Sequence, residues 1–489
     1  MEEITKRMRL ITILTINFSR TQYEKNSFIN PDQKRGRLTI VSLLTLLSVV
    51  TVNIPYGVFI PLFLVVCMVF LVVPYKKIIN MLWTGILVTS FLGSYLGIPG
   101  NSSIFLFRIL LILHCIMFVF FDKKEWNRIS YFKIHFILLG IWLAGSGITL
   151  FWAGLRIEAV RYIYYIFEAC YLILLIVYYV YDQKSYRHFV NVIIFFYIFA
   201  IIIGIIEVFT GWHMPLSGSL FYETLTSKFQ PTAFLYNTND YAMFLAIFFP
   251  LVFCSIWRMN IRPWNIYLAI LLLLLSLYLI ITTYSRMGIV AIVLEVIIIF
   301  IFYMRKSIVF IVFGFSVYLL IESFFQQNSQ MKLEQIIISA FTKKGASTNE
   351  RMNLYQTSWD IIRDSHFLGV GAGNVPTQIY SYLTGHESIG NMYRAPHNFW
   401  LETIGGIGFF SFAIVGFILI LFTSSIRIWL KHKHITNTIQ FLIPLLILIV
   451  FSFSSIALST IIEKRYLWIA LGFVVRMTNI EFIEKKEGD

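Results

Sequence analysis

Apolar stretches long enough to cross a membrane recur along almost the whole chain, separated by short polar breaks. A membrane-spanning helix needs about 20 apolar residues. On that criterion the sequence predicts spans near 38–54, 58–74, 78–98, 104–121, 134–152, 162–181, 189–210, 240–257, 264–283, 287–304, 307–324, 398–421, 439–461 and 466–476. Because several breaks are short and the last stretch is brief, we expect about 12–14 helices in an all-α, polytopic membrane protein.

Composition supports the same class of protein. Apolar residues make up 58% of the chain and charged residues 13%, with a mean hydropathy of +0.77. A soluble domain carries about 25% charged residues, so a soluble protein is excluded. All four cysteines lie inside apolar stretches, which indicates neither a disulfide framework nor a zinc cluster.

The charge distribution predicts how the chain is oriented. The chain has 39 Lys and Arg against 25 Asp and Glu. An N-terminus placed inside puts 26 of the basic residues in inner loops or tails and 12 in outer loops, with Arg108 left within a span. Because basic loops stay in the cytoplasm, we expect a multi-pass protein of the plasma membrane with both termini inside. Nucleic-acid binding would require a basic surface on a folded soluble module, and the sequence contains no such module.

These spans and loops predict five segments. They are a cytoplasmic segment 1–37, about eleven transmembrane helices over 38–324, an extracytoplasmic loop 325–397, further transmembrane helices over 398–476, and a cytoplasmic tail 477–489.

The large loop 325–397 has the pattern of folded structure. Ser347–Glu350 has the Ser-x-x-Glu form of a capping box, and Met352, Tyr355, Trp359 and Ile362 follow at the spacing of one helical face. Gly369–Gly373 superficially resembles a dinucleotide-binding fingerprint. It follows a helix instead of a strand and lacks the third glycine, so a tight glycine turn is the better interpretation.

Ionisable residues at the outer ends of spans are the candidates for chemistry, because charges are expensive in a membrane. They are Arg156, Glu158, Arg161, Glu207, Arg286, Arg394, His397 and Glu402. For Arg161 a structural role is an equally good interpretation: an arginine at a helix end often extends its charged group to the membrane–water interface. Arg286 lies in so short a helix break that it must be at the mouth of the bundle. Pro396 suits the entry of a helix, where its missing N–H donor costs nothing, and His397 follows it at that entrance.

Four motifs in order resemble the O-antigen ligase and polysaccharide polymerase superfamily. They are Thr283–Gly288, Asn349–Arg351 with Trp359, Phe367–Asn374, and Pro396–Asn398 with Leu401–Glu402 and Gly405–Gly408. Together they cover about residues 230–410. The chain departs from the family at Gln230–Ala233, where members often carry an Arg and a Gly, and it agrees again at Asn237–Asp240.

The resemblance implies a class C glycosyltransferase-like enzyme that uses an undecaprenyl-diphosphate-linked oligosaccharide in the lipid bilayer, with no cofactor and no metal. Arg286 matches the arginine that binds the diphosphate, and His397 matches the histidine that assists the acceptor. Arg351, Arg394 and Arg161 are expected to contact the substrate, and Glu402 to orient the imidazole or to serve the fold. A flippase or a chain-length protein is the kind of partner that such an enzyme implies.

Alternatives remain at this stage. A metal-dependent polyprenyl-phosphate sugar transferase needs acidic residues in the first outer loop, and the loops near 54–57 and 99–103 have none. A flippase or other transporter would have a similar number of spans, but transporters often show two related halves, and no repeat is visible here. A polymerase and a ligase act on the same donor. Richness in Ile, Phe, Tyr, Lys and Asn is compatible with a Gram-positive bacterium, which favours a polymerase of capsule or teichuronic acid repeat units over an O-antigen ligase.

Overall fold

The computed structural model describes residues 75–98, 101–121, 124–220, 227–258, 264–303, 345–385, 394–432 and 438–479. The chain divides into two compact units, one formed by 1–84 and 112–123 and the other by 85–111 and 124–489. The predicted spans 38–54, 58–74 and 307–324 lie outside the described residues, as do the segment 1–37 and most of the tail 477–489.

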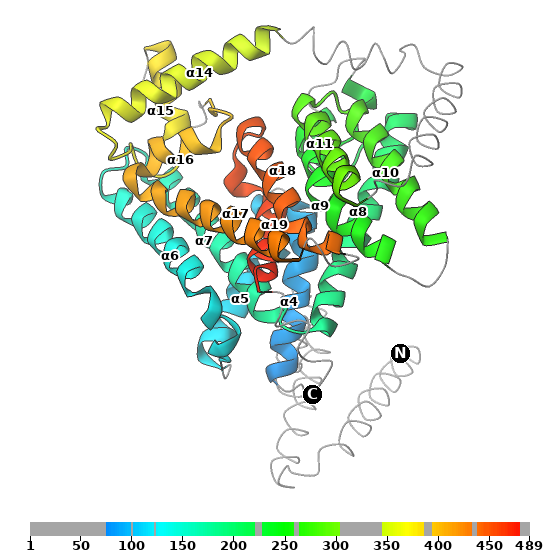
Figure 1. Ribbon diagram of the computed structural model, residues 1–489. Coiled ribbons are helices and arrows are strands. Elements are labelled where there is room, and N and C mark those ends of the chain that lie inside the picture. Colours follow the sequence, from blue (N-terminus) through cyan, green and yellow to red (C-terminus); the bar gives the residue numbers. More distant parts are fainter. Residues whose placement is uncertain are drawn as a thin grey trace, which may run out of the picture. The chain divides into compact units, whose positions relative to one another are not determined.

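The described residues are almost entirely helical. Their helices are α4 (Tyr75–Leu92), α5 (Leu106–Phe120), α6 (Lys133–Ile148), α7 (Arg156–Tyr179), α8 (Gln183–Thr210), α9 (Thr238–Arg258), α10 (Trp264–Thr282), α11 (Arg286–Tyr303), α14 (Gly345–Asp364), α15 (Val375–Thr384), α16 (Phe399–Ile407), α17 (Phe412–His432), α18 (Ile443–Ala457) and α19 (Arg465–Met477) (Figure 1). A small antiparallel hairpin joins β1 (Gly97–Ile98) to β2 (Asn101–Phe105).

Eight helical segments among the described residues are long and apolar enough to cross a membrane. The predicted all-α, polytopic membrane class is therefore confirmed. The span predicted over 398–421 falls within the candidate span Phe399–His432, whose helix is interrupted between α16 and α17 at Gly408, with a φ of +65°. The last predicted span is α19, which has only 13 residues.

The first unit is described only in part, over the first turns of α4 and the last turns of α5. In α5 the rings of His114 and Phe118 stack with their centroids 5.8 Å apart, as neighbours one helical turn apart can.

In the second unit α9 is the most deeply buried of the candidate membrane spans and packs against α8, α10, α11, α18 and α19. Helix α19 also packs along α7, where Gly472 allows close approach: a Cβ there would lie 2.7 Å from the Cδ1 of Ile176. Small residues at helix contacts serve this purpose in membrane proteins. The core of this unit therefore consists of helices far apart in sequence.

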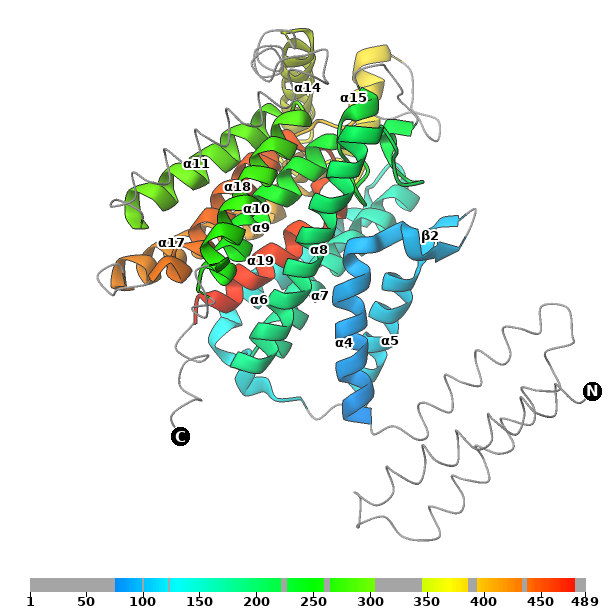
Figure 2. The ribbon, with the colours of Figure 1, turned by 90° about the vertical axis from the view of Figure 1, so that its right-hand side faces the viewer.

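Helices α14 and α15 lie at one end of the second unit in both views (Figures 1 and 2). Leu354 and Ile361 of α14 form a small core with Val375 and Ile379 of α15. The predicted helix is therefore present; Met352 and Trp359 of its predicted apolar face are exposed, whereas Leu354 and Ile361 pack on α15. The helix begins at Gly345, so Ser347 lies within it.

The predicted tight glycine turn links α14 to α15. Gly369, Gly371 and Gly373 all have positive φ. The backbone N–H groups of Val370 and Gly371 donate to the carbonyl oxygens of Gly405 and Gly406 in α16, at 2.8 and 3.0 Å. The turn thus fastens α14 and α15 to the C-terminal end of α16.

The other side of the turn is fastened to the α6–α7 connection. Trp152 Nε1 donates to the Gly369 oxygen at 2.8 Å, the Ala372 N–H donates to Thr149 Oγ1 at 3.0 Å, and the Leu155 N–H donates to Asn374 Oδ1 at 2.7 Å. Backbone atoms of three parts of the chain thus meet at the glycine turn.

We expect Gly371→Ala to destabilise the protein more than Gly385→Ala. Both glycines have positive φ, which an L side chain tolerates poorly at a cost of about 1–2 kcal/mol. Only at Gly371 would the new Cβ also meet backbone, 2.7 Å from the Ala153 Cα, whereas nothing lies within 4 Å of Gly385. Thermal unfolding of both variants in detergent measures the difference, and equal melting temperatures would show that the close packing of the turn is unimportant.

Candidate functional site

His397 lies in a tight turn directly before α16. Its φ is +51°, in the left-handed region that non-glycine residues seldom adopt. The cap of α16 is Asn398, whose Oδ1 accepts from the N–H groups of Trp400 and Leu401. Pro396 lies two residues before the cap, at the predicted entry of the helix. The strained turn and the cap together fix the backbone position from which the imidazole of His397 extends.

Helix α14 and the end of α18 also contact this turn. The Tyr355 hydroxyl lies 3.4 Å from the His397 carbonyl oxygen and 3.3 Å from that of Ile456, as a shared donor. An Arg351 amine donates to the carbonyl oxygen of Ala457 at 3.4 Å. Two motifs that lie about fifty residues apart in the sequence thus meet around His397.

The surroundings of His397 favour a neutral imidazole. Partial burial lowers the pKa of His397 from its usual 6.5, and the positive charge of Arg351 lowers it further. The carboxylate of Glu350 acts in the opposite direction and raises this pKa. Glu350 also pairs with Arg394 at 3.3 Å, on the exposed side of the turn. A histidine with a lowered pKa accepts a proton at neutral pH.

Arg286 is the first residue of α11. The break after α10 is short, and Tyr284 within it has a φ of +58°. Gly288, one turn into α11, packs against α9: a Cβ there would lie 2.7 Å from the Cβ of Ala242. Arg286 is half-buried at a helix N-terminus, where backbone N–H groups also favour an anion. The predicted helix break at Arg286 is confirmed.

Glu402 and Arg161 lie apart from the imidazole turn. Glu402 is 4% exposed on α16, within electrostatic reach of Tyr162 and Glu463. The carboxylate that acts on His397 is that of Glu350, so an orienting role of Glu402 stays a prediction. Arg161 is exposed and pairs with Glu158, one turn earlier on α7, at 2.9 Å.

The segment that follows α8 is held by the buried carboxylate of Glu207. Its Oε2 accepts from the N–H groups of Thr232 and Ala233, both at 2.7 Å. His213 lies with Nδ1 3.1 Å from Glu207 Oε1 and Nε2 2.9 Å from the Lys228 carbonyl oxygen. This clamp belongs to the stretch where the sequence departs from the superfamily pattern.

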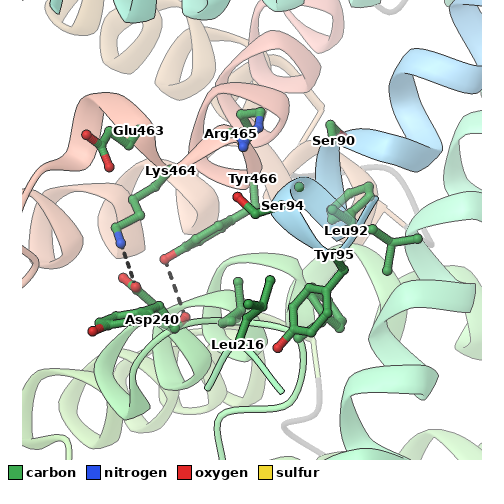
Figure 3. A pocket seen from close by; sticks show the side chains of 15 residues that line it. Ser90, Leu92, Ser94, Tyr95, Leu216, Asp240, Glu463, Lys464, Arg465 and Tyr466 are labelled. Carbon is green, nitrogen blue, oxygen red and sulfur yellow. Dashed lines mark hydrogen bonds and ion pairs between the residues drawn. The ribbon is translucent and has the colours of Figure 1, made fainter. Parts of the chain in front are cut away.

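A cavity of about 190 Å³ adjoins this segment (Figure 3). Its wall comes from Ser90–Tyr95, Leu216, Phe234–Tyr236, Asp240 and Glu463–Tyr466. Lys464 Nζ and Asp240 Oδ2 form an ion pair at 2.6 Å, and the Tyr466 hydroxyl lies 3.4 Å from the Asp240 carbonyl oxygen. This ion pair thus connects the start of α9 to the start of α19 at the cavity.

A second ion pair lies behind the cavity wall. Arg108 Nε and Glu168 Oε1 are 2.9 Å apart, and the guanidinium of Arg108 faces the ring of Phe105 at 4.7 Å. Arg465, which lines the cavity, faces the same ring at 4.7 Å and that of Phe107 at 4.8 Å. In the part of the chain that the structure describes, no three His, Cys, Asp or Glu side chains gather as a metal site would need.

Sequence reasoning missed this cavity. In the sequence Arg108 stands out only as a basic residue inside a span. Glu463–Arg465 forms only the break before the short last span. The run of an acid and two bases between apolar stretches was the available signal, since such clusters in membrane segments usually have a function.

Comparisons with known proteins agree with the motifs. Residues 271–416 match the family described as O-antigen ligase. The chain is 25% identical over 402 residues to the "Teichuronic acid biosynthesis protein TuaE" of Bacillus subtilis (strain 168), a match that covers 78% of this chain and 80% of that protein. A solved chain described under "Structural coordination of polymerization and crosslinking by a peptidoglycan synthase complex" aligns with a TM-score of 0.37 and 12% identity, covering 73% of this chain and 98% of that one. The protein described here therefore carries an O-antigen ligase family domain, and the resemblance that its motifs indicated is confirmed.

Proposed function

We propose that the chain is a membrane glycosyltransferase that polymerises repeat units of a teichuronic-acid-type polysaccharide from an undecaprenyl-diphosphate-linked donor. The family match supports transfer of a lipid-linked polysaccharide, and the name of the relative supports teichuronic acid as the polymer. The observation that carries the proposal is the half-buried imidazole of His397, which a strained turn holds near Arg351 and whose pKa burial and that cation lower.

The proposed reaction needs one base and one site for a leaving anion. Neutral His397 takes the proton from an acceptor hydroxyl while the hydroxyl oxygen forms a bond to the anomeric carbon of the donor sugar. The bond from that carbon to the diphosphate oxygen breaks, and the negative charge that leaves with the diphosphate is stabilised by Arg286 at the start of α11. Arg351 and Arg394 supply further positive charge beside His397.

This transfer needs no metal, because a diphosphate is already a good leaving group and guanidinium groups can stabilise its charge. The predicted orientation puts the site on the extracytoplasmic side of the plasma membrane. The breaks before α7, α11, α16 and α19 all fall at ends that the charge asymmetry assigns to that side. Loop 325–397 would then receive the growing chain outside the cell.

A deletion strain tests the polymerase assignment against the ligase alternative. Without a polymerase, the undecaprenyl-linked glycans that accumulate are expected to carry single repeat units. Full-length lipid-linked chains in the same strain, detected by mass spectrometry of the lipid extract, would instead indicate a ligase and contradict the proposal. A strain complemented with the wild-type gene is the control.

His397→Asn should lower turnover by about 10²–10⁴-fold, the usual worth of positioned proton transfer. Asparagine tolerates the left-handed backbone that this position requires, so folding should be spared. Wild-type activity should fall as the pH drops below the pKa of His397, which lies under 6.5, because only the neutral ring accepts a proton. The variant should lose this acid limb.

The matched control is His366→Asn, because His366 also has a positive φ, of +50°, and lies exposed on the same segment. Its turnover and pH profile should equal those of wild type. An unchanged acid limb in His397→Asn would remove the histidine from the proton transfer.

Arg286→Lys should weaken the binding of undecaprenyl diphosphate and lower activity, although the charge is kept. Lysine lacks the planar fork that engages two phosphate oxygens at once. His397→Asn should leave this binding nearly intact, so the two variants separate in an equilibrium binding assay with the purified proteins. Arg427→Lys, at an exposed position on α17, is the control. Wild-type affinity in Arg286→Lys and Arg286→Ala would exclude a diphosphate contact.

A further inference from the structure

The cavity at the start of α19 contains buried polar atoms that no described protein group engages. Asp240 is 1% exposed, and its Oδ2 pairs with Lys464 while its Oδ1 has no hydrogen-bond partner among the described residues. The Nε of Arg465, also buried, has no such partner either. Buried polar atoms are almost always hydrogen-bonded, so an unengaged acceptor and an unengaged donor in one cavity indicate a ligand with both kinds of group.

The wall has the composition of a saccharide site. Aromatic rings of Phe91, Phe234, Tyr95, Tyr236 and Tyr466 surround the few charged groups. Ligand sites are typically built in this way, with aromatic walls and a small number of placed polar groups that fix orientation. A volume of about 190 Å³ gives room for one sugar ring and not for an oligosaccharide.

The charge balance disfavours a ligand with several negative charges. Two acids, Asp240 and Glu463, and two bases, Lys464 and Arg465, line the cavity. The neighbouring Arg108 is already paired with Glu168. A diphosphate would bring several negative charges into a balanced site and close to the Asp240 carboxylate, whereas one carboxylate adds one charge. Sugar hydroxyls can in turn donate to Asp240.

Arg465 is prepared to bind such a carboxylate. Its guanidinium is held against the rings of Phe105 and Phe107, at 4.7 and 4.8 Å, which limits the orientations it can take. Hydrogen bonds from guanidinium to carboxylate are charge-assisted and about twice as strong as neutral ones. A preorganised donor of this kind distinguishes an acidic sugar from a neutral one.

We propose that this cavity binds one acidic sugar residue of the glycan substrate, with Arg465 donating to its carboxylate and Asp240 accepting from a hydroxyl. The inference rests on the proposed function, which it extends to the choice of substrate. Glu463 of the cavity wall lies within electrostatic reach of Glu402, five residues after His397. A sugar bound in the cavity therefore lies beside the helix that carries the proposed base.

The test measures binding of glucuronate, glucose and inorganic diphosphate to the full-length protein in lipid nanodiscs, by saturation-transfer NMR. Wild type should bind glucuronate at least tenfold more tightly than glucose. Arg465→Gln should lose that preference and weaken glucuronate binding at least tenfold. Arg427→Gln, the same change at an exposed position on α17, should bind like wild type.

Equal affinities of wild type for glucuronate and glucose would overturn the inference, and this comparison needs no variant to fold. Unchanged glucuronate binding in correctly inserted Arg465→Gln would overturn it too. Diphosphate binding that requires Arg465, without glucuronate binding, would assign the cavity to the lipid carrier and also overturn it.

The experiments can distinguish failure of the cavity proposal from failure of the proposed function. Transfer of repeat units by wild type without glucuronate binding would defeat the inference alone. Glucuronate binding by a protein that transfers no repeat units would leave the inference standing and defeat the proposed function. His397→Asn should keep glucuronate binding, because the histidine does not line the cavity.

Discussion

The backbone clamp around Gly369–Asn374 is the constraint on which the proposed site depends. It ties α14 and α15 to the carbonyl oxygens of α16 on one side and to the α6–α7 connection on the other. Because α14 carries Arg351 and α16 follows His397, the clamp decides how far the cation lies from the imidazole. Only residues without a side chain fit where backbone meets backbone this closely. The glycines of the turn thus allow the close packing that holds α14 beside α16.

Buried ion pairs likewise connect membrane helices that lie far apart in the sequence. Lys464 and Asp240 come from α19 and α9, and Arg108 and Glu168 from α5 and α7. Such pairs add little net stability, because desolvation offsets much of the attraction, but removing one partner leaves an uncompensated charge and is strongly unfavourable. Their consequence is therefore specificity: they select the arrangement of helices in which the starts of α9 and α19 meet at the cavity.

Much of the fold could be predicted from the sequence, because a membrane-spanning helix needs an apolar stretch of about 20 residues and such stretches are visible in the sequence. The break between α10 and α11 was also visible, since Tyr284–Arg286 interrupts two apolar runs. The division of 398–421 at Gly408 was not, because apolar residues lie on both sides of it and only the backbone conformation reveals the break. The face of α14 that packs on α15 was not visible either, because Leu354 and Ile361 lie outside the apolar series Met352, Tyr355, Trp359 and Ile362 and are buried only by the partner helix.

The candidate site was predictable to the extent that its residues lie in short motifs. His397, Arg286 and Arg351 each stood out at the end of a predicted span or helix. Glu350 as a partner of Arg394, and Asp240 as a partner of Lys464, were not predictable, because 44 and 224 residues separate the two members of these pairs. Ion pairs of this kind depend on which helices pack together, and an apolar pattern carries no information about that.

The arrangement around His397 meets two requirements that oppose each other. A cation near the imidazole attracts an anionic donor and keeps the ring neutral, but the same cation makes the ring a weaker base. Arg351 acts in this direction, and Glu350 acts against it. Since Glu350 also pairs with Arg394, one carboxylate moderates both cations beside the turn. Positive charge at Arg286 lies on a different helix, at the start of α11. In the proposed reaction, dividing the charges in this way would let the protein stabilise a departing diphosphate without depriving His397 of its basicity.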